Sequence, residues 1–382
     1  MIYRQLGRTG IDVGVVGLGA EHLEYAPRET VTSMVHELID RGVNYIDLFM
    51  ASPAVRDNFG EALAGKRQQV VIAGHLGAIM QDGQYCRSRD RQLSVKYFED
   101  LLTRLRTDYI DVLMLHYVDE PDDYDDVFGP GGLLEIAERL KKEGKARAIG
   151  MSSHCVPVSL NAVKSGHIDV LMFPVNPAFD TLPGDTKVES LVYDSSYRQE
   201  GDTREKFIAQ RQELYQACAR YGVGIAVMKP YAAGLLFAPE NPSGIVLTAV
   251  QCLSYALAQP GVCTVVPGCK NVAEMKAALA FLEATEAEKD FSAIDVNSAW
   301  KLQGSCMYCN HCLPCPVGID IGITTRILDT AGDNPDEKTV AEYEGLTVNA
   351  SACTECDECE TRCPFGVEII ANMARATAVF HT

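Results

Sequence analysis

The chain has 382 residues, of which 47% are hydrophobic and 23% charged, and its formal net charge is −18 at pH 7. This length suits a barrel-sized domain with a smaller domain attached, and the apolar content excludes a disordered or fibrous protein. The 52 acidic residues exceed the 34 basic ones, which disfavours nucleic acid and anionic membranes as partners. No stretch approaches the roughly 18 consecutive apolar residues of a membrane span, and the N-terminus lacks a signal-peptide core. We therefore expect a cytoplasmic protein.

A regular alternation of short apolar runs and amphipathic segments fills the first 295 residues. The runs are rich in β-branched residues and bounded by turns, as strands covered on both faces are. They lie at 13–19, 43–49, 70–74, 109–116, 146–152, 169–176, 223–230 and 263–268. Between them, residues 133–144 have the helical apolar spacing, and Gly144 is placed to end that helix. This pattern predicts an α/β fold of the (β/α)8 barrel type, with a doubly wound open sheet as the alternative. The alternative is disfavoured because no G-x-G-x-x-G follows the first strand.

Eight of the 14 cysteines lie in the last 80 residues, in two regularly spaced sets. The first set is Cys306, Cys309, Cys312 and Cys315, and the second is Cys353, Cys356, Cys359 and Cys363. Each set ends in Cys-Pro, and the second has the spacing of the bacterial run that binds [4Fe–4S] clusters. Because the fourth cysteine of such a run serves the other cluster, we assign Cys363 to the first cluster and Cys315 to the second. Zinc is the alternative, but zinc sites take four ligands from two pairs.

The cysteine spacing places a domain boundary near Trp300, so we predict a barrel at 1–297 and a small, mostly α-helical ferredoxin-like domain at 298–382. Two clusters favour electron transfer, because one would suffice for a structural role. They also predict an oxygen-sensitive protein from an anaerobic setting, with an electron-transfer protein as a candidate partner.

Several segments, in order along the barrel, resemble the aldo-keto reductases. They are YRQLGRTGIDVGVVGLG, GVNYIDLF, YIDVLMLH, KKEGKARAIGMSSH and GVGIAVMKPYAAGLL. With the C-terminal cysteines, the resemblance points to the branch of that family that carries a ferredoxin-like domain with two [4Fe–4S] clusters. It implies an oxidoreductase whose catalytic aspartate, tyrosine, lysine and histidine lie at the carboxyl ends of barrel strands.

Two of those four catalytic residues differ here. Asp47 and His116 match the family aspartate and histidine, whereas Ser52 stands in place of the tyrosine and His75 in place of the lysine. A serine hydroxyl is a much weaker acid than a phenol, while a histidine can itself carry a proton near neutral pH. We therefore expect Asp47, His75 and His116 to do the acid–base work, and standard carbonyl reduction by the family mechanism is in doubt.

Four histidines end barrel strands, and with Glu21 and Asp47 they suggest a mononuclear zinc, manganese or iron site as an alternative to a metal-free acid–base pocket. They are His22, His75, His116 and His154. The favoured function is an oxidoreductase that acts on a small polar substrate (a carbonyl, hydroxyl or anionic compound) with electrons relayed through the clusters. The alternatives are a lyase, dehydratase or isomerase that uses the same residues, and a non-catalytic electron-transfer or binding protein.

The resemblance also implies a site for NAD(P)H across the barrel mouth. The matching positions are Ser152, Ser153, Asn176, Lys229, Gly268 and Lys270. The helix after the last strand lacks the asparagine that the family often uses for adenine. A polar insertion at 181–207, with Arg198 and Arg204, could cap the site, and the acidic stretch at 119–132 is interpreted as a solvated loop.

Overall fold

The computed structural model describes most of the chain. The described residues are 1–180, 201–238, 246–294, 306, 308, 310–332, 334–363 and 366–381, with only the backbone for 201–206. They separate into two compact units. The first contains 1–79, 87–180 and 201–294, and the second contains 80–86 together with the residues from 306 onward. The predicted boundary between 297 and 298 lies outside the described residues and stays a prediction.

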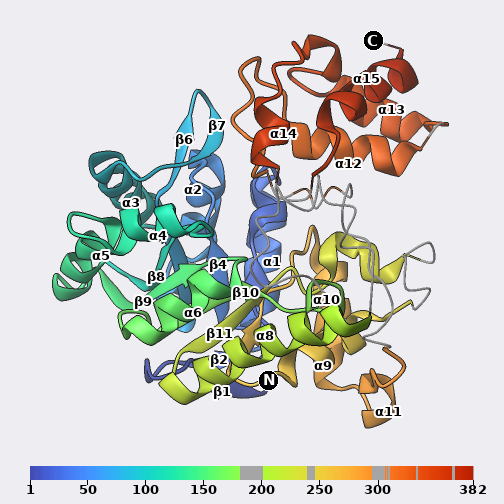
Figure 1. Ribbon diagram of the computed structural model, residues 1–382. Helices are drawn as coiled ribbons and strands as arrows, with labels where there is room; N and C mark the ends of the chain where they lie inside the picture. Colours follow the sequence, from blue (N-terminus) through green and yellow to red (C-terminus); the bar gives the residue numbers. More distant parts are fainter. Residues whose placement is uncertain are drawn as a thin grey trace. The chain divides into compact units, whose positions relative to one another are not determined.

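A parallel eight-stranded sheet forms the first unit (Figure 1). Its strands are β3 (Leu18–Gly19), β4 (Tyr45–Leu48), β5 (Val71–Leu76), β8 (Ile110–Leu115), β9 (Ala146–Ser152), β10 (Val170–Pro174), β11 (Gly224–Met228) and β12 (Val262–Val265). They pair in this order, and isolated parallel bridges from Val16 to Val265 and from Gly19 to Gly268 join the two ends of the sheet. The barrel prediction is therefore confirmed, and each of the eight predicted runs overlaps one barrel strand.

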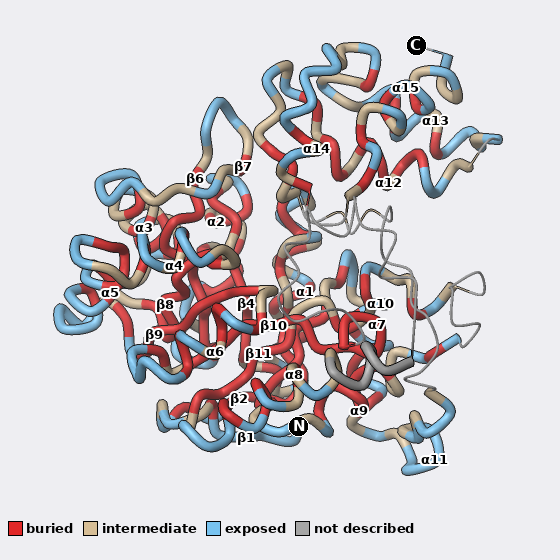
Figure 2. The backbone as a smooth tube through the Cα atoms, in the orientation of Figure 1, coloured by how far each residue is buried: buried red, intermediate tan, exposed pale blue. Residues whose placement is uncertain are grey.

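Helices cover the outside of the strands. Those of the first unit are α1 (Arg28–Asp40), α2 (Pro53–Ala62), α3 (Arg91–Leu105), α4 (Pro121–Phe128), α5 (Leu133–Lys142), α6 (Val156–Ser165), α7 (Pro177–Asp180), α8 (Gly201–Tyr221), α9 (Ala249–Leu257), α10 (Val272–Leu279) and α11 (Glu286–Lys289). Figure 2 shows buried residues along the strands and on the helix faces that meet them. The predicted helix at 133–144 is α5, and Gly144 follows it in the left-handed conformation, with φ of 80°.

The barrel interior is an apolar cluster separate from the one between strands and helices. It takes alternate residues of the strands, such as Tyr45 on β4, Ala73 on β5 and Met114 on β8. An antiparallel hairpin of β1 (Tyr3–Gln5) and β2 (Asp12–Gly14) contributes to the same cluster. Because this hairpin closes the end at which the strands begin, the opposite end, where the strands finish, is left as the place for chemistry.

An ion-pair cluster holds that hairpin in place. The Arg8 guanidinium donates to Asp169 at 2.9 Å and to the carbonyl oxygen of Gly166 at 2.7 Å, while Lys141 donates to the other oxygen of Asp169 at 2.9 Å. Burial raises the pKa of the Asp169 carboxyl, but the hydrogen bonds from Lys141 and Arg8 outweigh it and lower the pKa below its ordinary value.

The second unit is mostly helical, as predicted. It contains α12 (Ile321–Ala331), α13 (Glu337–Glu344), α14 (Glu358–Arg362) and α15 (Ile369–Phe380). A hairpin that the sequence analysis missed, β6 (Ala78–Gln81) and β7 (Gln84–Arg87), has its turn in this unit. There the Gln84 side chain accepts from the backbone N–H of Cys315 and donates to its carbonyl oxygen, both at 2.9 Å. The side-chain amide thus fixes the backbone of a predicted cluster ligand.

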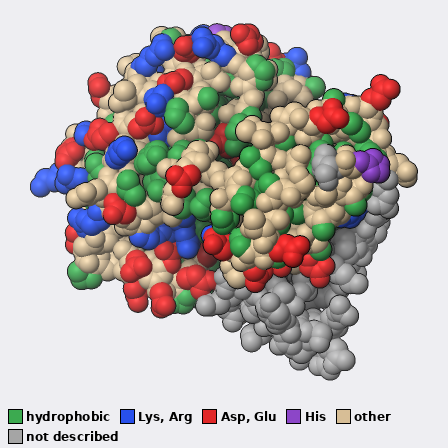
Figure 3. Space-filling view, turned by 90° about the horizontal axis from the view of Figure 1, so that it is seen from above, with side chains coloured by type: hydrophobic (Ala, Val, Ile, Leu, Met, Phe, Trp, Pro, Cys, Tyr) green, Lys and Arg blue, Asp and Glu red, His purple; other side chains and the backbone are tan. Residues whose placement is uncertain are grey.

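Charged side chains of both signs are interspersed on the face drawn in Figure 3. Among the described helices, none combines the length and apolar character needed to cross a bilayer.

Candidate functional site

The alternation of side chains along the strands directs three predicted catalytic residues into the barrel. Tyr45, Ala73 and Met114 face the interior, so the residues two positions further along each strand, Asp47 and His75, and His116 just after β8, face it too. The strand register sets their heights. Asp47 lies beside Ala73, and His75 lies beside Met114. Along the barrel axis, His75 therefore lies one inward-facing position closer to the barrel mouth than Asp47, and His116 lies one such position closer than His75.

These three side chains form a hydrogen-bonded series. Nε2 of His75 lies 2.9 Å from Oδ1 of Asp47, and Nδ1 of His75 lies 2.7 Å from Nδ1 of His116. All three are buried. The Phe49 ring stacks on the His116 ring, with centroids 5.7 Å apart, and meets the edge of the His75 ring. The predicted residues thus come together, with the Phe49 ring against both imidazoles.

When His75 is neutral, its two bonds fix the direction of every donor in this series. A carboxylate only accepts hydrogen bonds, so Nε2 of His75 carries the proton in its bond to Asp47. A neutral imidazole has one N–H, so Nδ1 of His75 must accept, and Nδ1 of His116 donates to it. The titratable nitrogen of the series is then Nε2 of His116. Both nitrogens of His75 are engaged, which leaves neither for a metal ion.

The residues proposed for a mononuclear metal do not otherwise converge. His22, in a 3-10 turn at Glu21–Leu23, packs against Gly268, where a Cβ would lie 2.6 Å from its ring. His154 pairs with Asp119 instead. Among the residues that the structure describes, no group of three or more His, Cys, Asp or Glu side chains is arranged to hold a single metal ion.

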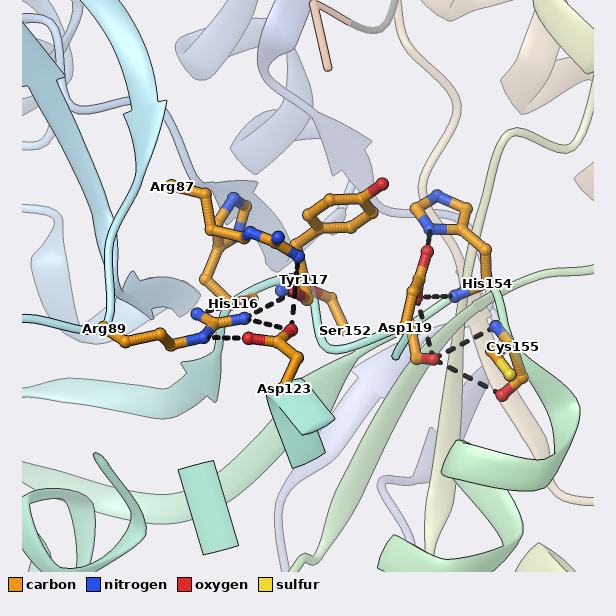
Figure 4. A network of polar contacts seen from close by, with 10 residues as sticks. Arg87, Arg89, His116, Tyr117, Asp119, Asp123, Ser152, His154 and Cys155 are labelled. Atoms are coloured by element: carbon orange, nitrogen blue, oxygen red, sulfur yellow. Dashed lines mark hydrogen bonds and ion pairs between the residues drawn. The ribbon is translucent and has the colours of Figure 1, made fainter. Parts of the chain in front are cut away.

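A second cluster of polar side chains surrounds Tyr117, which follows His116 (Figure 4). Arg89 makes a two-point ion pair with Asp123, at 2.5 and 2.6 Å, and donates to the carbonyl oxygens of His116 and Tyr117, at 2.8 and 2.7 Å. Arg87 also donates to the Tyr117 carbonyl, at 3.2 Å. Asp123 is buried on α4, so the interpretation of 119–132 as a solvated loop is wrong. The Asp123 carboxylate turns inward because Arg87 and Arg89, from the chain before α3, pair with it.

Asp119 belongs to the same stretch and organises His154. Its carboxylate accepts from the Nδ1 of His154 at 2.9 Å, from the His154 backbone N–H at 2.6 Å and from the Ser153 hydroxyl at 3.0 Å. Burial raises the pKa of the Asp119 carboxyl, but the neighbouring His154 and these hydrogen bonds outweigh it and lower the pKa below its ordinary value. Asp119 is therefore a carboxylate that fixes the orientation of the His154 ring.

The residues predicted to contact a nicotinamide make internal bonds. The Ser152 hydroxyl accepts from the Tyr117 N–H at 2.8 Å. Ser153 and Asn176 are fully buried, and the Asn176 amide donates to the Lys229 carbonyl at 2.8 Å while its oxygen accepts from the Phe179 N–H. Whether these side chains also reach a nucleotide stays a prediction.

The remaining nucleotide positions lie around the last two strands. Lys229 has a φ of 52°, in the left-handed region, and Gly268 is the partner of Gly19 in the bridge that closes the barrel. Lys270 is exposed, and its backbone N–H donates to Glu274. Of the predicted insertion, 181–200 lies outside the described residues and 201–206 has only its backbone described, so Arg198 and Arg204 have no described side-chain position.

The two cysteine segments share an unusual backbone that suits a cluster. Tyr308 and Asn310, on either side of Cys309, are left-handed, with φ of 48° and 57°. Glu355 and Asp357, on either side of Cys356, are left-handed in the same way, with φ of 55° and 66°. Such residues are costly unless the chain must curl, so the backbone of both segments is tightly curled at the cysteine positions. Cys309 itself lies outside the described residues.

The thiols of the second segment lie close together. Burial, followed by the nearby Glu360, Cys353 and Cys356, raises the pKa of the Cys359 thiol to about 11. Cys312 and Cys363, which we assign to the first cluster, are both buried. Thiolates are the ligands that iron–sulfur clusters take, so the donor set and the backbone fit such a group.

Family models match both parts of the chain. Residues 11–178 match the model of the aldo/keto reductase family, and residues 305–368 match that of a 4Fe-4S dicluster domain. The chain therefore contains an aldo/keto reductase domain followed by a 4Fe-4S dicluster domain, as the resemblance predicted.

Named relatives extend these matches. The uncharacterized oxidoreductase YqkF of Bacillus subtilis is 30% identical over 184 residues, covering 47% of this chain and 58% of that protein. L-galactose dehydrogenase of Arabidopsis thaliana is 28% identical, over 44% of this chain and 54% of that protein. L-glyceraldehyde 3-phosphate reductase of Escherichia coli is 23% identical, over 62% and 63%. The chain thus spans roughly half of the length of the first curated relatives it matches.

The solved aldo-keto reductase AKR11C1 from Bacillus halodurans, in its holo form, aligns with a TM-score of 0.58 at 24% identity. The alignment covers 76% of this chain and 94% of that one, which shows the barrel fold.

Proposed function

We propose that the protein is an iron–sulfur oxidoreductase that interconverts a small polar carbonyl compound and its alcohol at the barrel mouth. The observation that carries this proposal is the buried series Asp47–His75–His116, which ends at a titratable nitrogen of His116. The oxidoreductase names of the relatives support it, and two of those names refer to a sugar, L-galactose, or a sugar phosphate, L-glyceraldehyde 3-phosphate.

The series can take up and release one proton while every side chain keeps its orientation. When His116 is protonated, it donates from Nδ1 to His75 and from Nε2 to a substrate oxygen, and Asp47 offsets the positive charge through His75. When Nε2 has given up its proton, the other two hydrogen bonds keep their directions. His116 therefore serves as general acid for reduction and as general base for oxidation, which replaces the tyrosine and lysine of the family.

Two [4Fe–4S] clusters are the proposed cofactors, and when bound they supply or accept single electrons. The proposed ligands are those assigned from the spacing: Cys306, Cys309, Cys312 and Cys363 for one cluster, and Cys353, Cys356, Cys359 and Cys315 for the other. Anaerobically purified protein should contain about eight iron and eight sulfide per chain. A Cys315→Ser variant should lose about half of both. Zinc at one or two per chain without sulfide would overturn the assignment.

The role of His116 is tested with His116→Ala in anaerobic assays of aldehyde reduction. We expect turnover to fall at least 100-fold while the visible absorbance of the clusters is unchanged, because general acid–base catalysis contributes about 10²–10⁴-fold. His167→Ala is the matched control, since His167 pairs with Glu138 at the surface. Equal turnover in wild type and His116→Ala would remove His116 from the mechanism.

NAD(P)H is a second candidate cofactor. A Ser52→Tyr, His75→Lys double variant returns the two missing family residues, and some NADPH-dependent carbonyl reduction should then appear if the nucleotide still binds. Binding is measured separately, by the change in NADPH fluorescence. Failure of both binding and activity would show that the chain does not use this cofactor.

A further inference from the structure

We propose that Tyr117, together with His154 and Asp119, forms a second proton-transfer site at the barrel mouth, which donates a proton to the substrate independently of Asp47, His75 and His116. The inference rests on the proposed function for its substrate class, a carbonyl compound. Tyr117 is not one of the four catalytic positions of the aldo-keto reductase pattern.

The first observation is the backbone of Tyr117. Its φ is 49°, which is unfavourable for a tyrosine, and its neighbours hold it there from both sides. The N–H donates to Ser152, and the carbonyl accepts from Arg87 and Arg89. The strained backbone of Tyr117 is thus fixed by three separate hydrogen bonds, and residues held in this way cluster at functional sites.

The second observation is the surroundings of the phenol ring. The Arg87 guanidinium carbon lies 4.8 Å from the ring centroid, over its face. The His154 ring meets it edge to face with centroids 5.4 Å apart, and the His116 ring centroid is 6.3 Å away. Figure 4 shows the Tyr117 ring between the two imidazoles. The positive charge of Arg87 over the ring stabilises the phenolate that remains after a proton has left.

The third observation is the pair of Asp119 and His154. Asp119 accepts from the backbone N–H and the Nδ1 of His154, so in the neutral ring Nδ1 carries the proton and Nε2 carries none. Asp119 also stabilises His154 when it is protonated. His154 is thus the adjacent imidazole that can return a proton to the Tyr117 phenolate, as Asp47 and His75 support His116.

Two proton donors match the stoichiometry of reduction by single electrons. A carbonyl compound takes up two electrons and two protons to become an alcohol: one proton bonds to carbon and the other to oxygen. When a one-electron donor supplies both electrons, both protons must come from acidic groups, and His116 and Tyr117 provide one each. A hydride donor carries one of those protons itself and would need only one of the two sites.

The test uses anaerobic full-length protein with glyceraldehyde as substrate and dithionite-reduced methyl viologen as the one-electron donor. Tyr117→Phe keeps the ring and its contact with Arg87 but removes the hydroxyl. We expect kcat to fall about 10²–10³-fold, with the cluster absorbance unchanged. Tyr25→Phe, at an exposed tyrosine, is the control. His154→Gln should displace the pH profile of kcat, which a merely structural role would not do.

A second readout does not depend on activity. In protein labelled with ¹³C at tyrosine Cζ, we expect the Tyr117 resonance to move toward the phenolate position at lower pH than that of the exposed Tyr25. That resonance should be absent in Tyr117→Phe and should titrate at higher pH in Arg87→Gln, which removes the guanidinium over the ring and leaves Arg89 on the Tyr117 carbonyl and the rings of His116 and His154 in place. Full activity of Tyr117→Phe, or a ¹³C titration that neither variant alters, would overturn the proposal. A wild type that reduces no carbonyl while the ¹³C titration behaves as expected would instead overturn the proposed function.

Discussion

Replacing Asp47 with asparagine should reverse the direction of the buried proton series. The carboxylate forces Nε2 of His75 to be the donor, whereas the asparagine amide can turn its NH₂ toward His75 and make Nε2 the acceptor. His75 would then donate from Nδ1, the Nδ1 of His116 would accept, and the Nε2 of His116 would carry a fixed proton. The same nitrogen could no longer act as a base, and no negative charge would support it as an acid.

The size of this effect follows from the tautomer. A single wrong tautomer in an Asp–His pair lowers kcat by about 10⁴-fold in serine-protease triads, which corresponds to about 5.5 kcal/mol in the activation barrier. Here the carboxylate acts through one additional imidazole, so we expect a loss of about 10³–10⁴-fold. The charge-assisted hydrogen bond also contributes about 1.5–3 kcal/mol to stability, so the thermal midpoint should fall by a few degrees.

A matched control is available on β8. Asp111 is also buried, and it accepts from Arg67, Arg147 and the Ile72 N–H at 2.8–2.9 Å, on the strand that leads to His116. Asp111→Asn should destabilise the barrel as much as Asp47→Asn, or more, but leave kcat unchanged. Steady-state kinetics give the activities, and ¹⁵N spectra of the histidines give the tautomers. Equal kcat values for the two variants, or unchanged His75 and His116 tautomers in Asp47→Asn, would refute the reasoning.

Three further perturbations test the fold and the second unit. Gly60→Ala on α2 would place a Cβ 2.0 Å from the Arg104 carbonyl oxygen, so the free energy of unfolding should fall by about 1–3 kcal/mol; an unchanged thermal midpoint would contradict this packing. Asp169→Asn should lower the midpoint at pH 7, and the deficit should vanish as the pH falls through and below 3.8, because a lowered carboxyl pKa stabilises only above that range; a constant deficit in circular dichroism melts would argue against it. Gln84→Ala removes both hydrogen bonds to Cys315, so iron should be lost to a chelator faster than from wild type; equal loss rates would exclude the clamp.

The barrel and the inward direction of its catalytic residues could be predicted from the sequence, because strand residues alternate. Once β4, β5 and β8 are placed, residues 47, 75 and 116 must face the interior at the end where the strands finish. The hydrogen bonds between the three side chains could not be predicted, since they depend on the register of neighbouring strands.

The role of the acidic stretch was missed for a different reason. Asp119 and Asp123 lie four positions apart in a run of carboxylates, which in isolation is typical of a solvated segment. The partner of Asp119, His154, lies 35 residues later, and the partners of Asp123, Arg87 and Arg89, lie 36 and 34 residues earlier. Nothing in the sequence therefore indicated that Tyr117, which follows His116, is a functional residue. A non-glycine residue in the left-handed conformation becomes visible only in the structure.

The way the barrel closes has a consequence for its motions. Its seam, between β3 and β12, is held by two isolated bridges, whereas β4, β5 and β8 pair over continuous register. Local opening should begin around β3, because its pairings with β12 and with β4 each involve only two residue pairs. Gly268 and His22 lie on that seam, so a long ligand laid across it could be admitted by a transient widening. Asp47, His75 and His116 would keep their spacing during such an opening, because β4, β5 and β8 stay paired with one another.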